Sequence, residues 1–333
     1  MINLSKSYTN KLSNYSYIDL FAGIGGFRLA FDSFGAKCVF TSEWDKYAKE
    51  VYFDNFNDQP NGDITKIKAN EIPRHDIICG GFPCQAFSIS GKRKGFDDTR
   101  GTLFFDIARI ADFHKPKLMI LENVKNIRKV DNGMTFQKIL DVLEKDLNYS
   151  VYHKILVGND FGVPQKRERV FILCFSKELS VNKYEFVKPN FENLMLQDIL
   201  EKNVKEKHVF IERDDISLRN IKPEKDLFGN YPNKPIRIGS MNKGGQGERI
   251  YHPYGSAITL SAYGGGPGKK TGAYLINDKV RKLTTRECAR LMGFPESFKI
   301  GKNINQSYTQ FGNAVIVNIV QSILKDLIDK KIL

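Results

Sequence analysis

The sequence predicts an α/β fold with a mostly parallel sheet, followed by a second, smaller domain that is rich in loops and mainly β. In the first 175 residues, short apolar runs alternate with helical patterns, as in βαβ units. After about residue 180 charged and polar residues dominate, and glycine clusters follow at 244–249 and 263–270. The 333 residues, 41% of them hydrophobic, can bury one large and one small core.

Apolar runs and helical spacing define the elements of the first domain. Buried strands are expected at 15–21, 37–42, 75–81, 117–123 and 170–175. A helix should follow the first strand from about Gly26 and end near Gly35. Within 133–147, apolar side chains recur at i, i+3, i+4, i+7 and i+11, which predicts an amphipathic helix packed on the core. A last helix is expected from Asn313 to Ile332, packed back on the first domain.

The charge and the cysteines limit the class of protein. Lys and Arg number 51 against 38 Asp and Glu, and a net charge of +13 favours a polyanionic partner. The polar N-terminal segment does not read as a signal peptide, and no apolar run is long enough for a membrane span, so a cytoplasmic protein is expected. Five dispersed cysteines without CxxC pairs, and five scattered histidines, indicate neither a disulfide framework nor a metal site.

The segment FAGIGG (21–26) follows the first predicted strand and opens a helix. Its Gly23 and Gly25 allow a tight turn and a close approach to a ligand. Glu43 ends the second strand, where a carboxylate suits ribose hydroxyls, and the neighbouring Trp44 suits stacking on adenine. Asp63, within Gly-Asp-Ile, is placed for an adenine amino group. Together these residues predict a cofactor that contains adenosine.

A second group of residues suits covalent chemistry at the carboxyl edge of the sheet. Gly-Gly-Phe-Pro ends the strand near residue 81 and places Cys84 in a loop, as a nucleophile. Glu122 emerges from an apolar strand, where a carboxylate is costly to bury without a partner or a chemical role. Arg167 and Arg169 precede the strand at 170–175; Arg169 is expected to face the cleft, and Arg167 is the second candidate for it.

These residue types suit methylation of carbon 5 of cytosine. That carbon is too weak a nucleophile until a thiolate adds to carbon 6 and an acid hydrogen-bonds or protonates N3. Cys84 would supply the thiolate, Glu122 the N3 partner, and Arg169 a contact to O2 that also stabilises the thiolate. The reacting atoms lie inside the duplex stack, so the base has to be flipped out.

The motifs FAGIGG, EWD, GDI, GGFPCQAFS, ENV, QKRER, RECARLMGFPESF and QFGNAV, in this order, resemble those of bacterial type II restriction–modification cytosine-5 DNA methyltransferases. The resemblance covers essentially the whole chain. It implies a Rossmann-like methyltransferase domain that uses S-adenosyl-L-methionine and yields S-adenosyl-L-homocysteine, without a metal. It also implies double-stranded DNA as substrate, a cognate restriction endonuclease that acts on the same site, and a monomer.

The resemblance assigns roles residue by residue. The catalytic positions match Cys84, Glu122, Arg167 and Arg169. The cofactor positions match Phe21, Gly23, Gly25, Glu43, Trp44, Asp63, Ile64, Leu103, Asn313 and Val315. The family commonly has Ser after the Asn of its final motif, where this chain has Ala314, which leaves a cofactor hydrogen bond from that side chain in doubt.

The recognition segments GGQGERIY (244–251), AITLSAYGGG (257–266) and TGAYL (271–275) resemble those of the family member that methylates the internal cytosine of GCGC. The implied DNA-binding residues are Ser88, Ser90, Gln246, Arg249, Thr259, Tyr263 and Gly266. The chain departs from that member at 252–254 and 267–269. The expected domains are 1–197 with 313–333 for catalysis and cofactor, 198–284 for target recognition, and 285–312 as a hinge.

Three other functions are compatible with parts of the pattern. The first is the related transfer-RNA cytosine-5 methyltransferase, which shares the catalytic motifs; the glycine-rich recognition segments favour duplex DNA instead. The second is a nicotinamide-dependent oxidoreductase, although Arg28 stands where the third glycine of a dinucleotide fingerprint belongs. The third is a catalytically inactive DNA-binding protein, which the joint presence of Cys84, Glu122 and Arg169 disfavours.

Overall fold

The computed structural model describes residues 2, 5–83, 103–188, 191–227, 229 and 231–333. The chain packs into two compact units. The larger comprises residues 3–156, 168–187 and 320–333, and the smaller comprises 1–2, 157–167 and 188–319. The smaller unit includes 157–167 and 285–312, which were expected in the catalytic domain and in the hinge. These compact units are not functional domains, so the functional domains expected from the sequence remain a prediction.

The described residues contain α-helices and short strands in both units. The helices are α1 Gly26–Asp32, α2 Lys46–Phe56, α3 Phe104–His114, α4 Met134–Asp141, α5 Thr285–Leu291, α6 Ile304–Asn313 and α7 Val317–Asp329. The strands are β1 Ser16–Leu20, β2 Lys37–Ser42, β3 Ile77–Gly81, β4 Leu118–Val124, β5 Ser150–Val157, β6 Gln165–Lys166, β7 Glu168–Phe175, β8 Ser217–Leu218, β9 Ile236–Ser240, β10 Arg249–His252, β11 Ala257–Ile258, β12 Ala273–Ile276 and β13 Lys279–Arg281.

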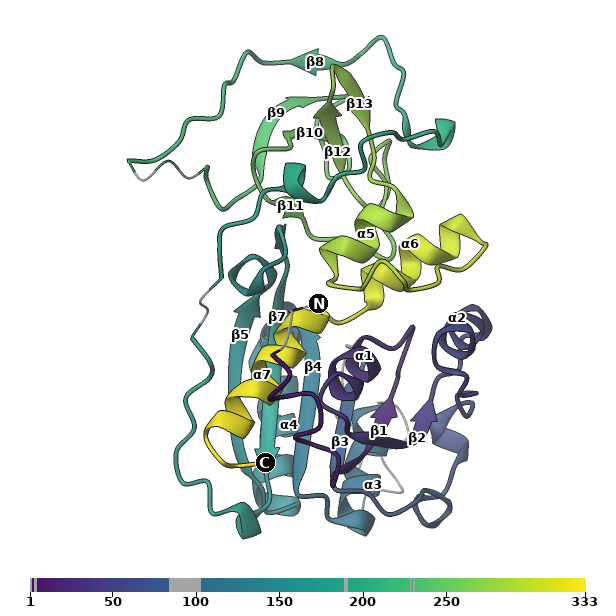
Figure 1. Cartoon of the computed structure of the whole chain (residues 1–333), viewed down its shortest axis with the longest axis vertical. Helices are drawn as coiled ribbons and strands as arrows, with labels where there is room; N and C mark the ends of the chain where they lie inside the picture. The colour runs from purple at the N-terminus through teal and green to yellow at the C-terminus, as the bar shows by residue number, and fades with distance from the viewer. Residues whose placement is uncertain (1, 3–4, 84–102, 189–190, 228, 230) are drawn as a thin grey trace. The chain divides into compact units, whose positions relative to one another are not determined.

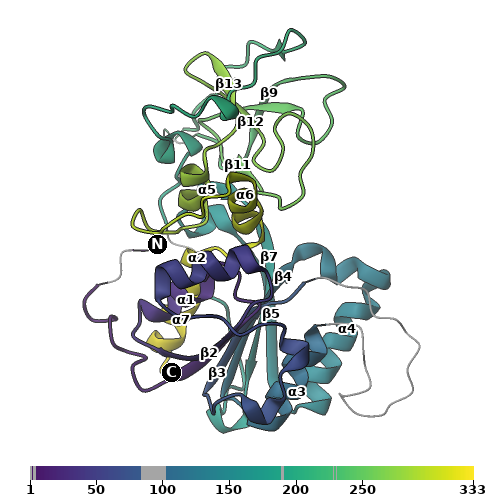
Figure 2. The same cartoon turned by 90° about the vertical axis from the view of Figure 1, so that its right-hand side faces the viewer.

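The larger unit is built on a sheet whose described strands run in the order β2-β1-β3-β4-β7-β5 (Figure 1). Strands β1, β2, β3 and β4 pair in parallel, whereas β7 pairs antiparallel to β4. Helices α1, α2 and α7 lie on one side of this sheet, and α3 and α4 lie on the other (Figure 2). The predicted α/β class is therefore confirmed, with a mixed rather than purely parallel sheet.

Near-continuous apolar sequence explains why the central strands are buried on both faces. The strand sequences IIC in β3, LMIL in β4 and VFILCF in β7 are completely buried, as expected for a sheet covered by helices on both sides. The predicted amphipathic helix at 133–147 is confirmed as α4 followed by a π-helical turn, Val142–Asp146. Its apolar stripe, including Ile139 and Leu143, packs into the core of the larger unit against residues of the sheet.

The predicted C-terminal helix was wrong in its start. Residue 313 ends α6, the backbone is extended at Ala314, and a separate helix, α7, begins at Val317. Residues 314–316 are Ala, Val and Ile, and none of these is a helix breaker, so no local signal at these positions predicts the break. Helices α2 and α3 and strand β5 were not predicted, because their apolar residues are few or interrupted by charge.

The smaller unit confirms the expected loop-rich β character. Its main described sheet has the strand order β13-β12-β10-β9-β8, and β11 pairs with β6 in a second, two-stranded sheet. A core of Ile238, Met241, Ile250, Ala273 and Val280 holds the main sheet together. Most of the intervening chain is irregular, with scattered turns, in keeping with its many glycines and charges.

One stretch of the described chain, Ile304–Asp329, is long and apolar enough by composition to cross a membrane. In its most apolar window 78% of the residues are buried inside the protein, as in a core helix of a folded domain. Within the same described residues, no group of three His, Cys, Asp or Glu side chains is arranged to hold a metal ion.

Asp19 of β1 is completely buried, and this carries a prediction about pH. Burial raises the pKa of its carboxyl from 3.8 to about 8, although the charge of Arg28 opposes the shift. Between pH 4 and pH 8 the unfolded chain has lost this proton while the folded chain keeps it. The free energy of unfolding should therefore fall as the pH rises through that interval, by at most about 1.4 kcal/mol per pH unit.

The substitution Asp19→Asn mimics the protonated carboxyl and should remove this contribution. Urea unfolding of both proteins from pH 5 to pH 9 measures it, because other titrating groups cancel in the difference. The variant should gain stability relative to the wild type as the pH rises. Parallel stability curves for the two proteins would show that Asp19 is ionised in the folded state.

Candidate active site

The register of three strands brings Gly81, Glu122 and Arg169 to one edge of the larger unit's sheet. Gly81 of β3 is opposite Glu122 of β4, and Val124, two residues further along β4, is opposite Arg169 of β7. Because β7 runs antiparallel, its first residues lie at the carboxyl ends of β3 and β4. Open α/β sheets bind their ligands at this edge.

Glu122 and Arg169 form a buried ion pair. Arg169 Nε lies 3.1 Å from Glu122 Oε1, and the two side chains are 14% and 10% exposed. Burial lowers the pKa of Arg169, while the charge of Glu122 and its hydrogen bond oppose that shift. Guanidinium pKa values start so high that Arg169 remains a cation at neutral pH. The edge thus holds a carboxylate whose charge is compensated by a fixed cation.

Asn123 ties this edge to the loop that leads to Cys84. Its side-chain Nδ2 donates a 2.8 Å hydrogen bond to the backbone oxygen of Phe82, and both residues are buried. The bond fixes the chain two residues before Cys84, which itself lies outside the described residues. Sequence reasoning missed Asn123; its place beside Glu122 in the ENV motif was the available signal.

The other cysteines are poor nucleophiles. Cys38, Cys79, Cys174 and Cys288 are free, and the last three are buried. Burial raises the pKa of all four thiols, which keeps them protonated at neutral pH. Cys79, Cys174 and Cys288 therefore pack as small apolar residues, and Cys38 is half-buried.

The predicted cofactor loop is held open by Glu43. One carboxylate oxygen accepts a 2.8 Å hydrogen bond from the backbone N–H of Gly23, and the other accepts from Trp44 and Asp45. The loop turns through left-handed backbone at Phe21, φ 57°, and Gly23, φ 56°. Apart from its two chain neighbours, no atom of the described residues lies within 4 Å of where a Cβ on Gly23 would stand, so the loop borders open space in that part of the structure.

The remaining predicted cofactor residues of the larger unit lie after β2, between α2 and β3, and at the start of α3. The Trp44 side chain is 77% exposed beside the anchored Glu43. Asp63 accepts hydrogen bonds from the backbone and hydroxyl of Thr65, and Ile64 is buried. Leu103 is half-buried at the start of α3. An exposed indole beside an open glycine loop fits a flat, partly apolar group such as adenosine. Asn313, exposed, and Val315, buried, belong to the smaller unit.

Arg167 is placed differently from the expectation. It is 1% exposed and donates hydrogen bonds to the backbone oxygens of Leu260, Gly312 and Ala314 at 2.9–3.1 Å, all within the smaller unit. A guanidinium engaged this way positions the backbone and does not face an open surface. The structure therefore corrects the expectation that Arg167 faces a cleft beside Arg169, and indicates a positioning role.

The glycine clusters at 244–249 and 263–270 pack backbone to backbone. The N–H of Gly268 donates a 2.7 Å hydrogen bond to the oxygen of Gly247. A Cβ on Gly247 would lie 2.1 Å from the oxygen of Gly265, so no larger residue fits there. Thr259 donates a 2.6 Å hydrogen bond to the oxygen of Lys166, which fixes the approach to the second segment.

Long side chains project to solvent from these packed segments. Gln246, Arg249 and Gly266 are exposed, and Tyr263 is 88% exposed. Arg249 Nε donates to the oxygen of Gly244, which steadies part of the side chain. A rigid backbone with exposed Gln, Arg and Tyr is typical of a surface that recognises nucleic acid. Ser88 and Ser90, also predicted to bind DNA, lie outside the described residues.

Comparison with known proteins identifies the family. Residues 15–329 match the family profile of C-5 cytosine-specific DNA methylases, and the chain belongs to this family. The type II methyltransferase M.HhaI of Haemophilus parahaemolyticus is 51% identical over 313 residues, which cover 94% of each chain. The type II methyltransferase M.HpaII of Haemophilus parainfluenzae is 41% identical over 98% of this chain and 92% of its own.

Solved structures agree on the fold. The Dnmt2 methyltransferase of S. pombe superposes with a TM-score of 0.70 at 21% identity, covering 95% of this chain and 99% of its own. The chain is thus a DNA cytosine-5 methyltransferase of the type II restriction–modification class. S-Adenosylmethionine is the methyl donor expected of this family, and the transfer-RNA, oxidoreductase and inactive alternatives are not favoured.

The position of Arg167 carries a prediction. Replacement by Lys keeps the charge but leaves at least one of the carbonyl oxygens without its donor, so unfolding should become easier by about 2–4 kcal/mol. Urea unfolding of Arg167→Lys, with Arg74→Lys at an exposed position as the matched control, measures this. Unchanged stability combined with lost methyl transfer would instead give Arg167 a direct catalytic role.

Proposed function

We propose that this methyltransferase modifies the internal cytosine of GCGC in duplex DNA through a covalent bond from Cys84 to carbon 6 of the base. The observation that carries the specificity is the packing of the two glycine-rich segments around Gly247, which presents Gln246, Arg249 and Tyr263 to solvent. These segments resemble those of the GCGC-specific family member. In this proposal Gln246 and Ser90 fill the space that the flipped base leaves in the duplex.

The other recognition residues have supporting roles in this proposal. Arg249, Tyr263 and Gly266 contact bases or their sugar–phosphate frame, and Ser88 contacts the DNA from the segment after Cys84. Thr259 positions the backbone, and its hydrogen bond to the oxygen of Lys166 supports that role. Side chains that reach base edges carry sequence information, whereas backbone contacts set the register.

The proposed catalytic residues are Cys84 and the buried ion pair of Glu122 and Arg169. The Cys84 thiolate adds to carbon 6, and Glu122, which takes up a proton from solvent for this step, donates that proton or a hydrogen bond to N3, which gives carbon 5 enamine character. Carbon 5 then takes the methyl group. Solvent accepts the proton from carbon 5, the thiolate leaves carbon 6, and N3 returns its proton to Glu122, which restores the aromatic ring. Arg169 holds the base at O2 and, through its 3.1 Å contact, fixes the orientation of Glu122.

The cofactor residues divide the work of binding. When bound, S-adenosyl-L-methionine supplies an electrophilic methyl group and leaves as S-adenosyl-L-homocysteine; no metal takes part. Glu43 binds the ribose and keeps the loop of Phe21, Gly23 and Gly25 open, which its hydrogen bond to Gly23 supports. Trp44 stacks on the adenine.

The adenine amino group and the rest of the cofactor are held by residues from later in the chain. Asp63 accepts a hydrogen bond from the adenine amino group, beside the buried Ile64. Leu103, Asn313 and Val315 complete the cofactor pocket in this proposal.

The biological setting completes the proposal. The protein acts as a cytoplasmic monomer, which suits the modification of one DNA strand at a time. Methylation protects the DNA from a cognate restriction endonuclease that reads the same site without contacting this chain. Catalysis and cofactor binding are assigned to 1–197 with 313–333, target recognition to 198–284 and the hinge to 285–312.

The specificity is tested with purified protein, unmethylated duplex DNA and methyl-labelled S-adenosylmethionine, followed by bisulfite sequencing. We expect label in 5-methylcytosine at the internal cytosine of GCGC and at no other motif. A parallel reaction with transfer RNA should remain unlabelled. Modification at a different fixed motif would leave the enzyme class intact but overturn our assignment of the recognition residues.

A further inference from the structure

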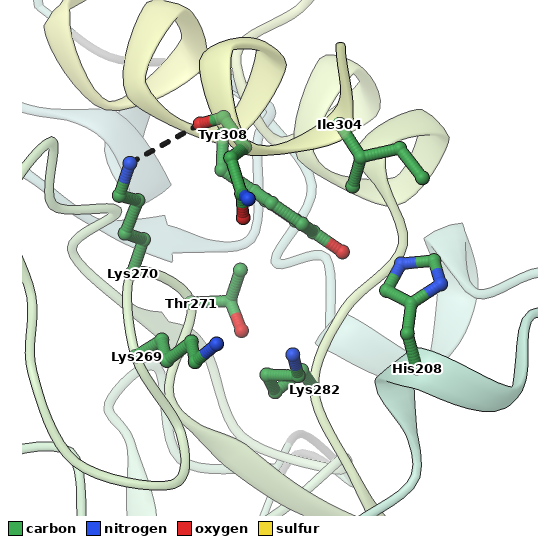
Figure 3. Close-up of a pocket in the computed structure, with 8 residues that line it drawn as sticks. His208, Lys269, Lys270, Thr271, Lys282, Ile304 and Tyr308 are labelled. Atoms are coloured by element: carbon green, nitrogen blue, oxygen red, sulfur yellow. Dashed lines mark hydrogen bonds between the residues drawn. The ribbon is translucent and has the colours of Figure 1, made fainter.

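A cavity of about 390 Å³ in the smaller unit contains a cluster of positive charge (Figure 3). Its described lining residues are His208, Lys269, Lys270, Thr271, Lys282, Ile304, Asn305 and Tyr308. Lys269 and Lys282 point into it on either side of Thr271, while Lys270 turns toward α6. None of these lining residues is an aspartate or a glutamate, so the cavity wall itself carries no compensating negative charge.

The three lysines have different surroundings. Lys270 Nζ donates hydrogen bonds to the backbone oxygen of Asn305, at 3.1 Å, and to the hydroxyl of Thr309. Among the described residues, no hydrogen bond or ion pair engages the amino group of Lys269 or of Lys282. Lys282 is nevertheless only 8% exposed, whereas Lys269 is exposed. Two ammonium groups that point into one cavity repel each other unless an anion joins them, and the buried stem of Lys282 limits how far its ammonium group can withdraw.

The pKa shifts of the cavity lysines also indicate positive charge that no anion compensates. Burial lowers the pKa of Lys270 and of Lys282, and the charge of Lys269 lowers both further. The nearby carboxylate of Glu287 is completely buried and already paired with Arg281 at 2.7 Å. The hydroxyl of Tyr308 donates to the oxygen of Leu283, which leaves its oxygen able only to accept. The side chains that can donate hydrogen bonds into the cavity are therefore those of Lys269, Lys282, His208 and Asn305.

We propose that this cavity binds a phosphate group, held by Lys269 and Lys282 and bordered by Lys270. Ammonium groups bind phosphate as point charges, and a second cation offsets the cost of burying the first once the anion is present. A volume of about 390 Å³ exceeds that of one phosphate and admits an attached sugar. The chemistry fits either a phosphodiester of DNA or a free phosphate compound.

The cavity adjoins the residues proposed to recognise DNA, which favours the DNA backbone as the source of the phosphate. This step depends on the proposed function. Lys269 and Lys270 directly follow Gly268, whose N–H is bonded to Gly247 in the packed recognition segments. A duplex read by Tyr263 and Arg249 would therefore bring its backbone close to Lys269. The cavity would then hold one phosphate in register and carry no sequence preference of its own.

The test compares the wild type with Lys269→Gln/Lys282→Gln across a series of salt concentrations, using one duplex that contains GCGC and one that lacks it. Loss of one phosphate contact should reduce the slope of log Kd against log salt by about 0.9 and weaken both duplexes about tenfold at 0.1 M salt. The ratio of the two affinities should stay constant. If the wild type binds the two duplexes equally well, the GCGC assignment is rejected. The comparison of salt slopes between wild type and variant still tests the phosphate site.

Two controls keep the result specific. Lys145→Gln/Lys183→Gln removes the same charge from exposed lysines of the larger unit and should leave the slope unchanged. Lys269→Gln alone alters an exposed residue, so a reduced slope in this variant cannot come from misfolding at the nearly buried Lys282.

A second measurement separates the two sources of phosphate. Thermal unfolding is recorded in sodium phosphate and in sodium chloride of equal ionic strength. An unchanged DNA slope, with phosphate stabilising the wild type but not Lys269→Gln/Lys282→Gln, would assign the cavity to a free phosphate compound and overturn the DNA source. An unchanged slope together with equal phosphate response in both proteins would reject the site itself.

Discussion

The buried ion pair between Glu122 and Arg169 is the interaction on which the catalytic edge depends. A carboxylate this far from water carries a desolvation cost of several kcal/mol unless a cation is fixed beside it. The antiparallel direction of β7 provides that cation, because it places the first residues of β7 next to the last residues of β4. In a parallel arrangement Arg169 would lie at the opposite end of the sheet, and Glu122 would lose this ion pair.

The rest of the larger unit supports this pair. Apolar β3, β4 and β7 form a rigid base, and Asn123 fixes the chain at Phe82 before Cys84. On the neighbouring strands, Glu43 holds the glycine loop open through backbone N–H groups. The same sheet edge thus carries Glu122 and Arg169, which are proposed for chemistry, and Glu43, which is proposed for the cofactor.

Much of this could be predicted from the sequence, and the exceptions have physical causes. The β3, β4 and β7 sequences are apolar throughout, so their polar neighbours at the strand ends stood out. Arg167 was misplaced because it lies between β6 and β7, where the strand alternation that relates it to Arg169 is interrupted. The break at 314–316 was missed because Ala314 carries no helix-ending signal. The lysine cavity depends on contacts between 208, 269–271, 282 and 304–308, which are distant in sequence.

The central claim is that Cys84 attacks the cytosine at this edge, and trapping the covalent adduct tests it most directly. Fluorine at carbon 5 cannot leave as a proton does, so duplex DNA with 5-fluorocytosine at the target position should stop the reaction after methyl transfer. With S-adenosylmethionine present, the wild type should form an adduct that survives denaturation, and peptide mass spectrometry should place it on Cys84. Cys84→Ala should form none. An adduct on another residue, or equal adduct formation by the variant, would contradict the account.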